Sequence, residues 1–257
     1  MIEVRNVSKT FKLSRQQKRE MGNRFTGNTV DAVSDVSFQC HPGRVFGLLG
    51  PNGAGKTTTL RMIATTLRPS AGSISVARHD VVEDAEKVRA RLGFLTGSTQ
   101  LYDRLTAGEL VKYYADLHGV PRDVYKQRRD EIFAALEITS YADRRIGKLS
   151  TGMKQKVSIA RAMIHDPEVL VLDEATAGLD VIASRSIMDL IKKARERGKT
   201  VLFSTHRMGE VSLLCDDVAL MHAGRLLYNG TYADFAAAMV APTLEDEFIR
   251  RIEAADA

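Results

Sequence analysis

One short segment, residues 50–57, limits the possible folds of this chain more than any other part of the sequence. It reads Gly-Pro-Asn-Gly-Ala-Gly-Lys-Thr and matches the pattern GxxxxGK[ST] in full. Residues 44–49 precede it as a short apolar run, which favours a buried parallel strand. A helix is predicted after it, because four apolar residues recur at helical spacing before Pro69, namely Leu60, Ile63, Ala64 and Leu67. The chain is therefore expected to run from a strand through a glycine-rich loop into a helix.

The chemistry of phosphate binding requires this layout. Glycines let the backbone curve closely enough for its N–H groups to point at phosphate oxygens, and the start of the helix adds the positive end of a dipole. Lys56 is expected to neutralise the β- and γ-phosphates, and the Thr57 hydroxyl to ligate Mg²⁺. The predicted nucleotide-binding set is Gly50, Pro51, Asn52, Gly53, Ala54, Gly55, Lys56, Thr57 and Thr58. The alternative is a glycine-rich turn with an incidental lysine, and the loop alone would equally suit a kinase, a GTPase or a helicase.

A second apolar strand is predicted at residues 169–172, and it ends in two carboxylates, Asp173 and Glu174. Parallel strands deliver such side chains to the carboxyl edge of a sheet, where phosphates bind. Asp173 is placed to hold Mg²⁺, directly or through water, and Glu174 to polarise the attacking water as a general base. An acidic pair at a strand end is also common in exposed turns, so this assignment depends on the phosphate loop.

The remaining periodicity indicates three structural parts. The start of the chain alternates apolar and polar residues and predicts an antiparallel sheet from residues 2–5 and 33–38. Residues 97–166 are helical almost throughout, with one predicted apolar stripe of Leu110, Tyr113, Tyr114 and Leu117 and another of Ile132, Phe133 and Leu136. Strands return at residues 169–172 and 200–204, and the helix between them has an apolar face of Ile187, Leu190, Ile191 and Ala194. Strands that alternate with helices make a parallel sheet covered on both faces.

The segment after residue 148 reads Leu-Ser-Thr-Gly-Met-Lys-Gln-Lys and opens a predicted helix shortly before the acidic strand. Together with the phosphate loop, it makes the chain resemble the ATPases of ABC (ATP-binding-cassette) transporters, whose signature LSGGQ is similar to LSTGM. The resemblance covers residues 2–232. It implies that Ser150, Thr151 and Gly152 form the part that meets the γ-phosphate of ATP held by a second subunit. As a bare pattern, the serine is equally a helix N-cap before a flexible turn.

Three further positions match the family. Asp180 resembles the last residue of the D-loop, through which two subunits sense each other's sites. His206, directly after a strand, resembles the switch histidine that senses the γ-phosphate and positions the attacking water, although a lone histidine there is usually structural. Phe11 occupies the place of the aromatic residue, usually tyrosine, that stacks on adenine; a position in the core is its alternative.

The sequence departs from the family pattern in four places, three of them near the expected site. Gly97 stands where a glutamine of the Q-loop normally ligates Mg²⁺, and Gln100 follows three residues later as a candidate metal ligand. Thr151 and Met153 replace a glycine and a glutamine of the signature. Ala175 replaces the usual proline after the catalytic glutamate, which should loosen that turn slightly.

The fourth departure is a long basic connection between the first two predicted strands. Residues 12–29 hold five cations and one acid, so they carry most of the formal net charge of +5. The segment is either a solvated loop or a contact with anionic lipid headgroups or a partner. Because the charge is local rather than spread over a face, it is weak support for nucleic-acid binding.

Cysteine usage and hydropathy indicate where the chain works. Cys40 and Cys215 form no metal-binding motif and are expected to be reduced and buried. No apolar run is long enough to span a bilayer, and the first residues have no apolar signal-peptide core. These features predict a chain that stays in the cytoplasm unless something tethers it. The resemblance implies a tether, a membrane permease that would hold the chain at the cytoplasmic face of the cell membrane.

The fold class that follows is α/β: a P-loop NTPase (RecA-like) parallel core with an antiparallel β subdomain and an inserted helical subdomain. We expect an ABC ATPase domain over residues 1–232, with the helical subdomain at about 97–166, and a C-terminal helical extension over residues 233–257. The resemblance implies an ATPase that uses ATP and Mg²⁺, pairs with a second copy of itself or a homologous subunit, and drives a separate integral-membrane permease.

The cargo is the least constrained part of this interpretation. Residues 60–67, 101–106 and 164–167, together with Gly97, are similar to the ATPase subunits of bacterial sodium-extrusion exporters, which also tend to lack the Q-loop glutamine. Sodium export is thus implied by analogy, since the membrane subunit selects the cargo. One alternative is an ABC ATPase acting on DNA or ribosomes, but the chain has one cassette and no heptad run, so no nucleic acid is expected. Another, a small-molecule kinase, leaves LSTGM and His206 unexplained.

Overall fold

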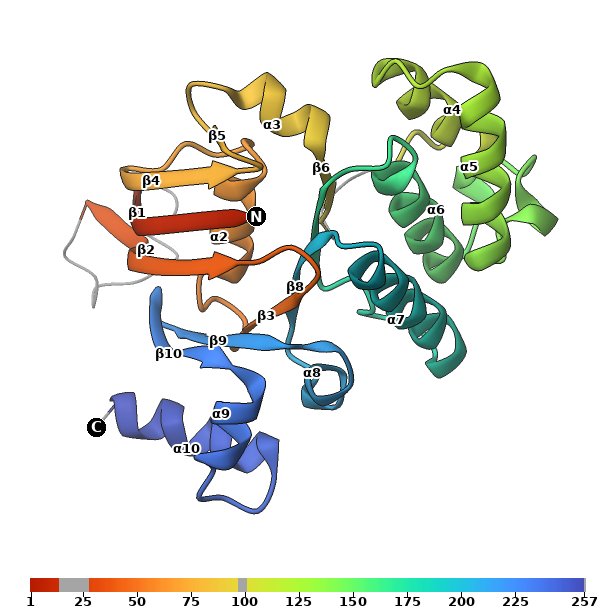
Figure 1. Ribbon diagram of the computed structural model, residues 1–257. Helices are drawn as coiled ribbons and strands as arrows, with labels where there is room; N and C mark the ends of the chain where they lie inside the picture. The colour runs from red at the N-terminus through yellow and green to blue at the C-terminus, as the bar shows by residue number, and fades with distance from the viewer. Residues whose placement is uncertain (14–27, 97–100, 257) are drawn as a thin grey trace.

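The computed structural model describes residues 1–13, 28–96 and 101–256, which form two sheets and several helices (Figure 1). The metal-ligand prediction for Gln100, the Gly97 position and most of the basic connection lie outside the described residues.

An antiparallel sheet opens the chain. Its strand order is β2-β1-β4-β5, made of β1 (Ile2–Lys12), β2 (Thr29–Cys40), β4 (Ala71–Val76) and β5 (His79–Asp80). One face of β1 and β2 is buried, as the alternating pattern predicts. Phe38 of this sheet stacks on Phe46 of the second sheet with ring centroids 5.0 Å apart, so the two sheets share a core.

The second sheet is the parallel core. Its order is β10-β9-β3-β8-β7-β6, made of β10 (Arg225–Thr231), β9 (Asp217–His222), β3 (Val45–Leu49), β8 (Thr200–Thr205), β7 (Val169–Asp173) and β6 (Leu92–Leu95). All pairs are parallel except β10 with β9, an antiparallel edge that the sequence interpretation did not include. Every residue of β3, β7 and β8 is buried, which confirms the prediction of strands covered on both faces. The predicted fold class is confirmed.

The order of the central strands decides what meets at the carboxyl edge of this sheet. Strand β8 pairs with β3 on one side and with β7 on the other. The loop after β3 and the carboxylates that end β7 therefore lie on either side of the residues that follow β8. Three segments far apart in the sequence are brought to one edge by strand order alone.

Four helices accompany the sheets: α2 (Lys56–Ile63), α3 (Ala85–Arg91), α7 (Val181–Glu196) and α8 (Met208–Leu214). The predicted apolar face of α7 is buried in full. The prediction for α2 was wrong at its end, because the helix stops at Ile63 and Leu67 lies beyond it. Thr65 adopts a left-handed conformation with φ of 60°, and its N–H bonds to Met62 O, which closes the last turn.

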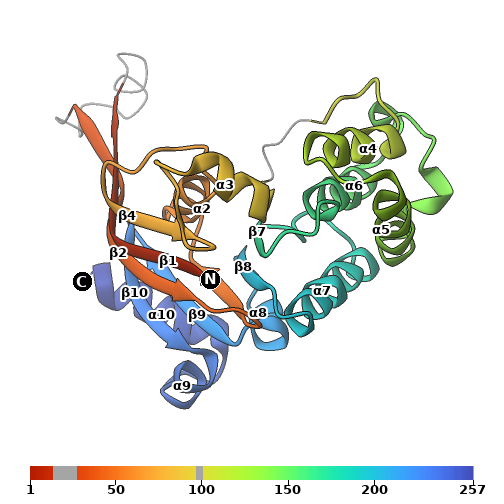
Figure 2. The same cartoon turned by 45° about the horizontal axis from the view of Figure 1, so that its top comes forward.

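A separate group of helices lies to one side of the sheets (Figure 2): α4 (Ala107–Leu117), α5 (Arg122–Ala135) and α6 (Thr151–Met163), with short 3₁₀ turns at Thr139–Tyr141 and Ile146–Lys148. We call this group the helical region. The predicted stripe of α4 is only partly correct: Leu110 is buried, but Tyr113 is 47% and Leu117 66% exposed. The buried face is rotated toward Val111 and Ala115, which leaves the two larger side chains in solvent.

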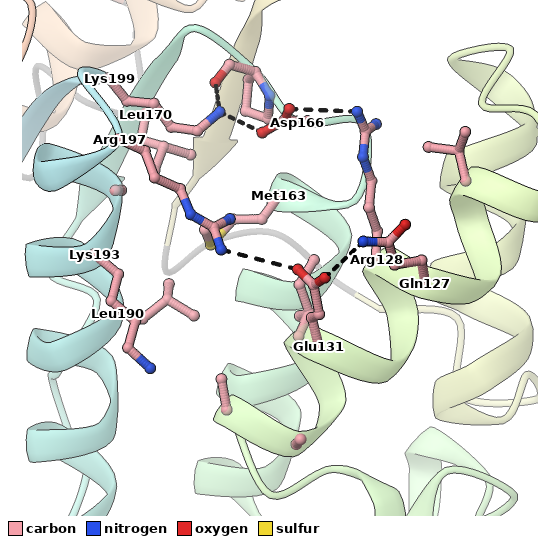
Figure 3. Close-up of a pocket in the computed structure, with 16 residues that line it drawn as sticks. Gln127, Arg128, Glu131, Met163, Asp166, Leu170, Leu190, Lys193, Arg197 and Lys199 are labelled. Atoms are coloured by element: carbon pink, nitrogen blue, oxygen red, sulfur yellow. Dashed lines mark hydrogen bonds and ion pairs between the residues drawn. The ribbon is translucent and has the colours of Figure 1, made fainter.

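A cavity of about 620 Å³ separates α5 of the helical region from α7 (Figure 3). Arg197, which caps the end of α7, pairs with Glu131 of α5 at 3.9 Å, and Arg128 of α5 pairs with Asp166, which follows α6, at 3.3 Å. Lys199 also donates to Asp166 at 2.5 Å. This cavity lies between helices and not at the carboxyl edge of the parallel sheet.

The last helices are α9 (Tyr232–Ala237) and α10 (Leu244–Asp256), so residues 233–256 are largely helical, as expected. Cys40 and Cys215 are both buried, as predicted, and burial raises the pKa of each thiol. Among the described residues, no helix combines the length and the apolar character needed to cross a bilayer.

Candidate functional site

The glycine-rich loop joins β3 to α2 as the sequence predicts, and α2 begins at Lys56. Gly55 caps the helix with φ of 106°, and a Cβ at this position would lie 2.5 Å from Ala32 O. Only glycine fits there, because both the backbone conformation and the approach of β2 exclude a side chain. The turn between β9 and β10 also contacts the glycine-rich loop, since Gly224 N donates to Ala54 O at 3.0 Å.

Lys56 lies within the loop rather than in solvent. Its side chain is buried, and Nζ donates to Gly50 O at 2.7 Å and to Pro51 O at 3.0 Å. Burial lowers the pKa of Lys56, and the nearby carboxylates of Glu174 and Asp173 partly oppose this shift. Neutral carbonyls are weaker acceptors than phosphate oxygens, so this ammonium group is well placed to bind an anion that enters the loop.

The carboxyl end of β7 is fixed by one hydroxyl group from β8. Ser204 Oγ donates to Asp173 Oδ1 at 2.6 Å and accepts from Glu174 N at 3.1 Å. Glu174 N also donates to Ser204 O at 3.1 Å. Asp173 is only 4% exposed, so this hydrogen bond fixes a carboxylate that has little access to water. The sequence interpretation missed Ser204, although its position one residue before the end of β8 is the signal that would have found it.

Glu174 adopts a backbone conformation that is unusual for its residue type. Its φ of 50° lies in the left-handed region, which costs a residue with a side chain about 1–3 kcal/mol. The two bonds from its N–H and the bond from Ala177 N to Glu174 O, at 3.0 Å, hold it there. Strain of this kind is typical of functional positions.

His206 and Glu174 contact each other directly. His206 Nδ1 lies 3.2 Å from Glu174 Oε1, and both side chains are partly exposed. The contact follows from the strand order, because β7 and β8 are neighbours and each residue comes directly after its strand. A carboxylate and an imidazole at this distance can share a proton and orient a water molecule.

A buried glutamate contacts the side chains of both neighbours of His206. Thr205 Oγ1 donates to Glu210 Oε2 at 2.8 Å, and Arg207 Nη1 lies 3.0 Å from Glu210 Oε1. Arg207 N in turn donates to Thr205 Oγ1 at 3.0 Å. Glu210 was also missed by the sequence interpretation. It lies in α8, and only folding brings its carboxylate to the side chains of Thr205 and Arg207.

The other predicted site residues lie away from this edge or have local roles. Ser150 caps α6 by accepting from Met153 N at 3.3 Å, and Asp180 caps α7 by accepting from Ala183 N at 2.8 Å. The N-cap alternative for Ser150 is therefore present in the structure. Phe11 is 39% exposed on β1, with Lys9 Nζ 5.2 Å from its ring centroid, so the alternative of a core position is wrong.

The residues predicted to hold Mg²⁺ have suitable chemistry. Thr57 and Asp173 offer a hydroxyl and a carboxylate, which are the hard oxygen ligands that this ion prefers. Outside the two gaps in the described chain, no group of three or more His, Cys, Asp or Glu side chains forms a ready-made metal site. An ion here would complete its shell with phosphate oxygens and water, as Mg²⁺ commonly does at nucleotide sites.

Sequence comparisons show which family of proteins this chain is similar to. The family described as "ABC transporter" matches residues 33–177. The ABC transporter ATP-binding protein NatA of Bacillus subtilis (strain 168) is 46% identical over 231 residues, which cover 90% of this chain and 89% of that protein.

Solved structures agree in fold along nearly the whole chain. The ATP-binding subunit of an ABC transporter superposes with a TM-score of 0.84 at 25% identity, covering 98% of this chain and 99% of that one. A dimeric post-hydrolysis state of the ATP-binding cassette MJ0796, bound to ADP and Pi, superposes with a TM-score of 0.78 at 25% identity, covering 90% and 98%.

Proposed function

Because this chain belongs to the ABC transporter family and is an ATP-binding subunit that hydrolyses ATP, we propose that it powers export, with Na⁺ as the cargo, through a separate integral-membrane permease. The observation that carries the catalytic part is the contact between Glu174 and His206 at the sheet edge next to the phosphate loop. The transport part rests on the family, and the choice of Na⁺ on the sequence similarity to sodium-extrusion ATPases.

In the proposed cycle, the glycine-rich loop and Lys56 bind the ATP phosphates, and Phe11 stacks on the adenine. Thr57 and Asp173 hold Mg²⁺, which neutralises charge on the β- and γ-phosphates when it is bound. Glu174 accepts a proton from the attacking water, and His206 orients that water and Glu174. Burial of Lys56 supports its role, because a lysine in a partly desolvated loop interacts strongly with an anion.

We further propose that two copies, or one copy and a homologous subunit, close around two ATP molecules. Ser150, Thr151 and Gly152 would then contact the nucleotide on the partner, and Asp180 would face the partner's site. The start of α6 supports this role, since Thr151 is exposed at the positive end of a 13-residue helix. The dimeric ADP-bound cassette described above is the precedent among solved structures.

The permease would dock on the helical region. Tyr102, Tyr113 and Leu117 are large apolar side chains that the fold leaves exposed, and the rings of Tyr102 and Tyr113 meet edge to face with centroids 6.4 Å apart. Clustered apolar side chains on a surface are typical of protein contacts. Docking there would hold the chain at the cytoplasmic face of the membrane.

The expected domain division belongs to the same proposal. Residues 1–232 would act as the ATPase domain, with residues 97–166 as the helical subdomain that meets the permease. Residues 233–257 would form a C-terminal extension outside the catalytic cycle.

The deciding experiment reconstitutes this chain with its co-purified permease in vesicles and follows Na⁺ movement on addition of ATP. Export predicts ATP-dependent Na⁺ transport away from the side that carries the ATPase, and none with the Glu174→Gln variant. Hydrolysis that the permease stimulates without Na⁺ movement would disprove the cargo and leave the subunit assignment intact. Failure of any membrane protein to co-purify would count against the permease, and salt-dependent binding to DNA would favour the nucleic-acid alternative.

A further inference from the structure

One hydrogen bond connects the helix that begins at the signature segment to the turn that carries Glu174. Gln155 lies in the second turn of α6, and its side-chain Nε2 donates to the backbone O of Ala175 at 2.9 Å. Ala175 is fully buried, so its carbonyl has no access to bulk water as an alternative partner. Glu174, the proposed catalytic base, directly precedes Ala175 in the chain.

A second contact joins the same two segments. The start of α6 packs against the end of the turn, since a Cβ built on Gly152 would lie 3.4 Å from Leu179 Cδ2. The turn itself continues into α7, which Asp180 caps. Residues 174–180 are therefore held by β8 through Ser204, by α6 through Gln155 and Gly152, and by the start of α7.

A short series of bonded residues therefore connects two proposed functional positions of one subunit, Ser150 and Glu174. Ser150 caps the start of α6, where the partner's ATP would bind, and Gln155 follows one and a half turns later. From Gln155 the series runs through the Ala175 carbonyl to the backbone of Glu174. A shift of α6 on nucleotide binding would therefore act on the residue whose left-handed backbone turns it toward His206.

We propose that Gln155 is a positioning residue for ATP hydrolysis: it holds the Ala175 carbonyl so that Glu174 keeps its contact with His206, and it links this placement to the position of the signature end of α6. The proposal rests on the role proposed above for Glu174. The hydrogen bond of the Gln155 side chain goes to the turn, so its effect on Glu174 passes through the turn. Loss of this hydrogen bond should therefore slow ATP turnover without weakening ATP binding.

The test replaces the amide by an apolar group of similar length in Gln155→Met, which keeps the packing of α6 but removes the donor. Steady-state ATPase rates across a range of ATP concentrations should give a kcat about 10-fold lower, with KM for ATP unchanged within twofold, because small misplacements of a catalytic group are costly. Adding Gln155→Met to Glu174→Gln should lower the residual rate by less than twofold, since both changes act on one group. A purely structural role would instead change KM and lower the rate in either background.

The control is Glu131→Gln, which removes the ion pair with Arg197 across the cavity between α5 and α7 without touching the turn (Figure 3). It should keep kcat and KM within twofold of wild type. If Gln155→Met does not fold, Gln155→Leu is a second variant that keeps a side chain in this place and removes the donor. An unchanged kcat in the folded variant, or a change confined to KM, overturns the proposal. A wild-type rate in Glu174→Gln alone would instead refute the proposed base.

Discussion

The carboxyl edge of the parallel sheet and the helical region satisfy their buried polar groups very differently. At the edge, the carboxylates of Asp173 and Glu210 accept hydrogen bonds from hydroxyls of β8. Glu210 Oε1 and His222 Nδ1 lack a hydrogen bond there, but their side chains pair with Arg207 at 3.0 Å and with Asp256 at 2.8 Å. In the helical region, Tyr141 Oη and Arg161 Nε are buried without a hydrogen bond. Such atoms lose free energy on burial, because nothing replaces the water that they bind in the unfolded chain.

The difference indicates that the residues with a fixed geometry and the exposed apolar surface lie in separate parts of this molecule. The proposed hydrolysis needs Glu174 and His206 within a narrow geometry, and the edge holds the Glu174 backbone with hydrogen bonds to Ser204. A region that meets another protein gains more from exposed apolar surface than from internal bonds. Each substitution below changes one of the two regions, and the measurement tests whether its effect stays within the role of that region.

The largest effect is expected from Glu174→Gln at the edge. Removing the proposed general base should lower kcat by about 10²- to 10⁴-fold, while ATP still binds and holds two subunits together. Turnover assays and size-exclusion chromatography with ATP would measure both. Glu168→Gln is the matched control, since Glu168 lies just before β7, at its opposite end, and is mostly exposed. A Glu174→Gln enzyme at wild-type rate would contradict the assignment.

The sequence predicts this edge well because its residues follow buried strands. The phosphate loop, Asp173, Glu174 and His206 each come directly after an apolar run, and strand order brings them together. The sequence interpretation did not include Ser204 and Glu210, which act through bonds to neighbouring strands and turns. Their partners become close only in the folded sheet.

The second prediction is Ser204→Ala, which removes the hydroxyl that fixes the end of β7. A hydrogen bond to a charged group contributes about 1.5–3 kcal/mol, so we expect kcat to fall about 10- to 100-fold. The affinity for Mg²⁺, read from the metal dependence of the rate, should fall with it, because Asp173 loses its orienting partner. Ser212→Ala, at an exposed serine of α8, should change neither quantity. Equal rates in the two variants would show that Asp173 and Glu174 hold their places without Ser204.

The helical region was less predictable, and α4 shows the reason. Its apolar residues allow more than one buried face, and the sequence interpretation chose one that includes Tyr113 and Leu117. The fold buries smaller residues instead, because α6 packs closely against α4. Periodicity finds a helix but does not decide which of two overlapping stripes a neighbour covers.

The third prediction concerns His165, whose ring stacks on His118 with centroids 3.8 Å apart. Burial lowers the pKa of His165 to about 4, the positive charges of His118, Lys199 and Arg128 add to this, and the Leu92 backbone opposes it. Burial also lowers the pKa of His118. Between the unfolded pKa of about 6.5 and this value, the unfolded chain binds a proton that the folded chain does not. Stability must therefore fall as the pH falls through this window.

From pH 7.5 to 5.5 the loss attributable to His165 should be about 1 kcal/mol, or about 2–4 °C in Tm for a chain of this size. Thermal melts of His165→Phe, which keeps a ring against His118, should show a pH dependence weaker by this amount. His41→Phe, at an exposed histidine, should melt with the wild-type pH dependence. If His165→Phe loses as much stability on acidification as wild type, the protons are taken up elsewhere.

The smallest effect on the isolated chain is expected from Tyr113→Ser and Leu117→Ser on the exposed face of α4. Because Tyr113 is about half exposed and Leu117 is mostly exposed, stability should change by less than about 0.5 kcal/mol and ATPase activity should stay at wild-type level. Recovery of the permease in co-purification should fall for both, whereas Lys112→Ser, at an exposed lysine of the same helix, should leave it unchanged. Loss of ATPase activity without the permease would mean that this face supports the catalytic edge, and the separation between the two regions would not hold.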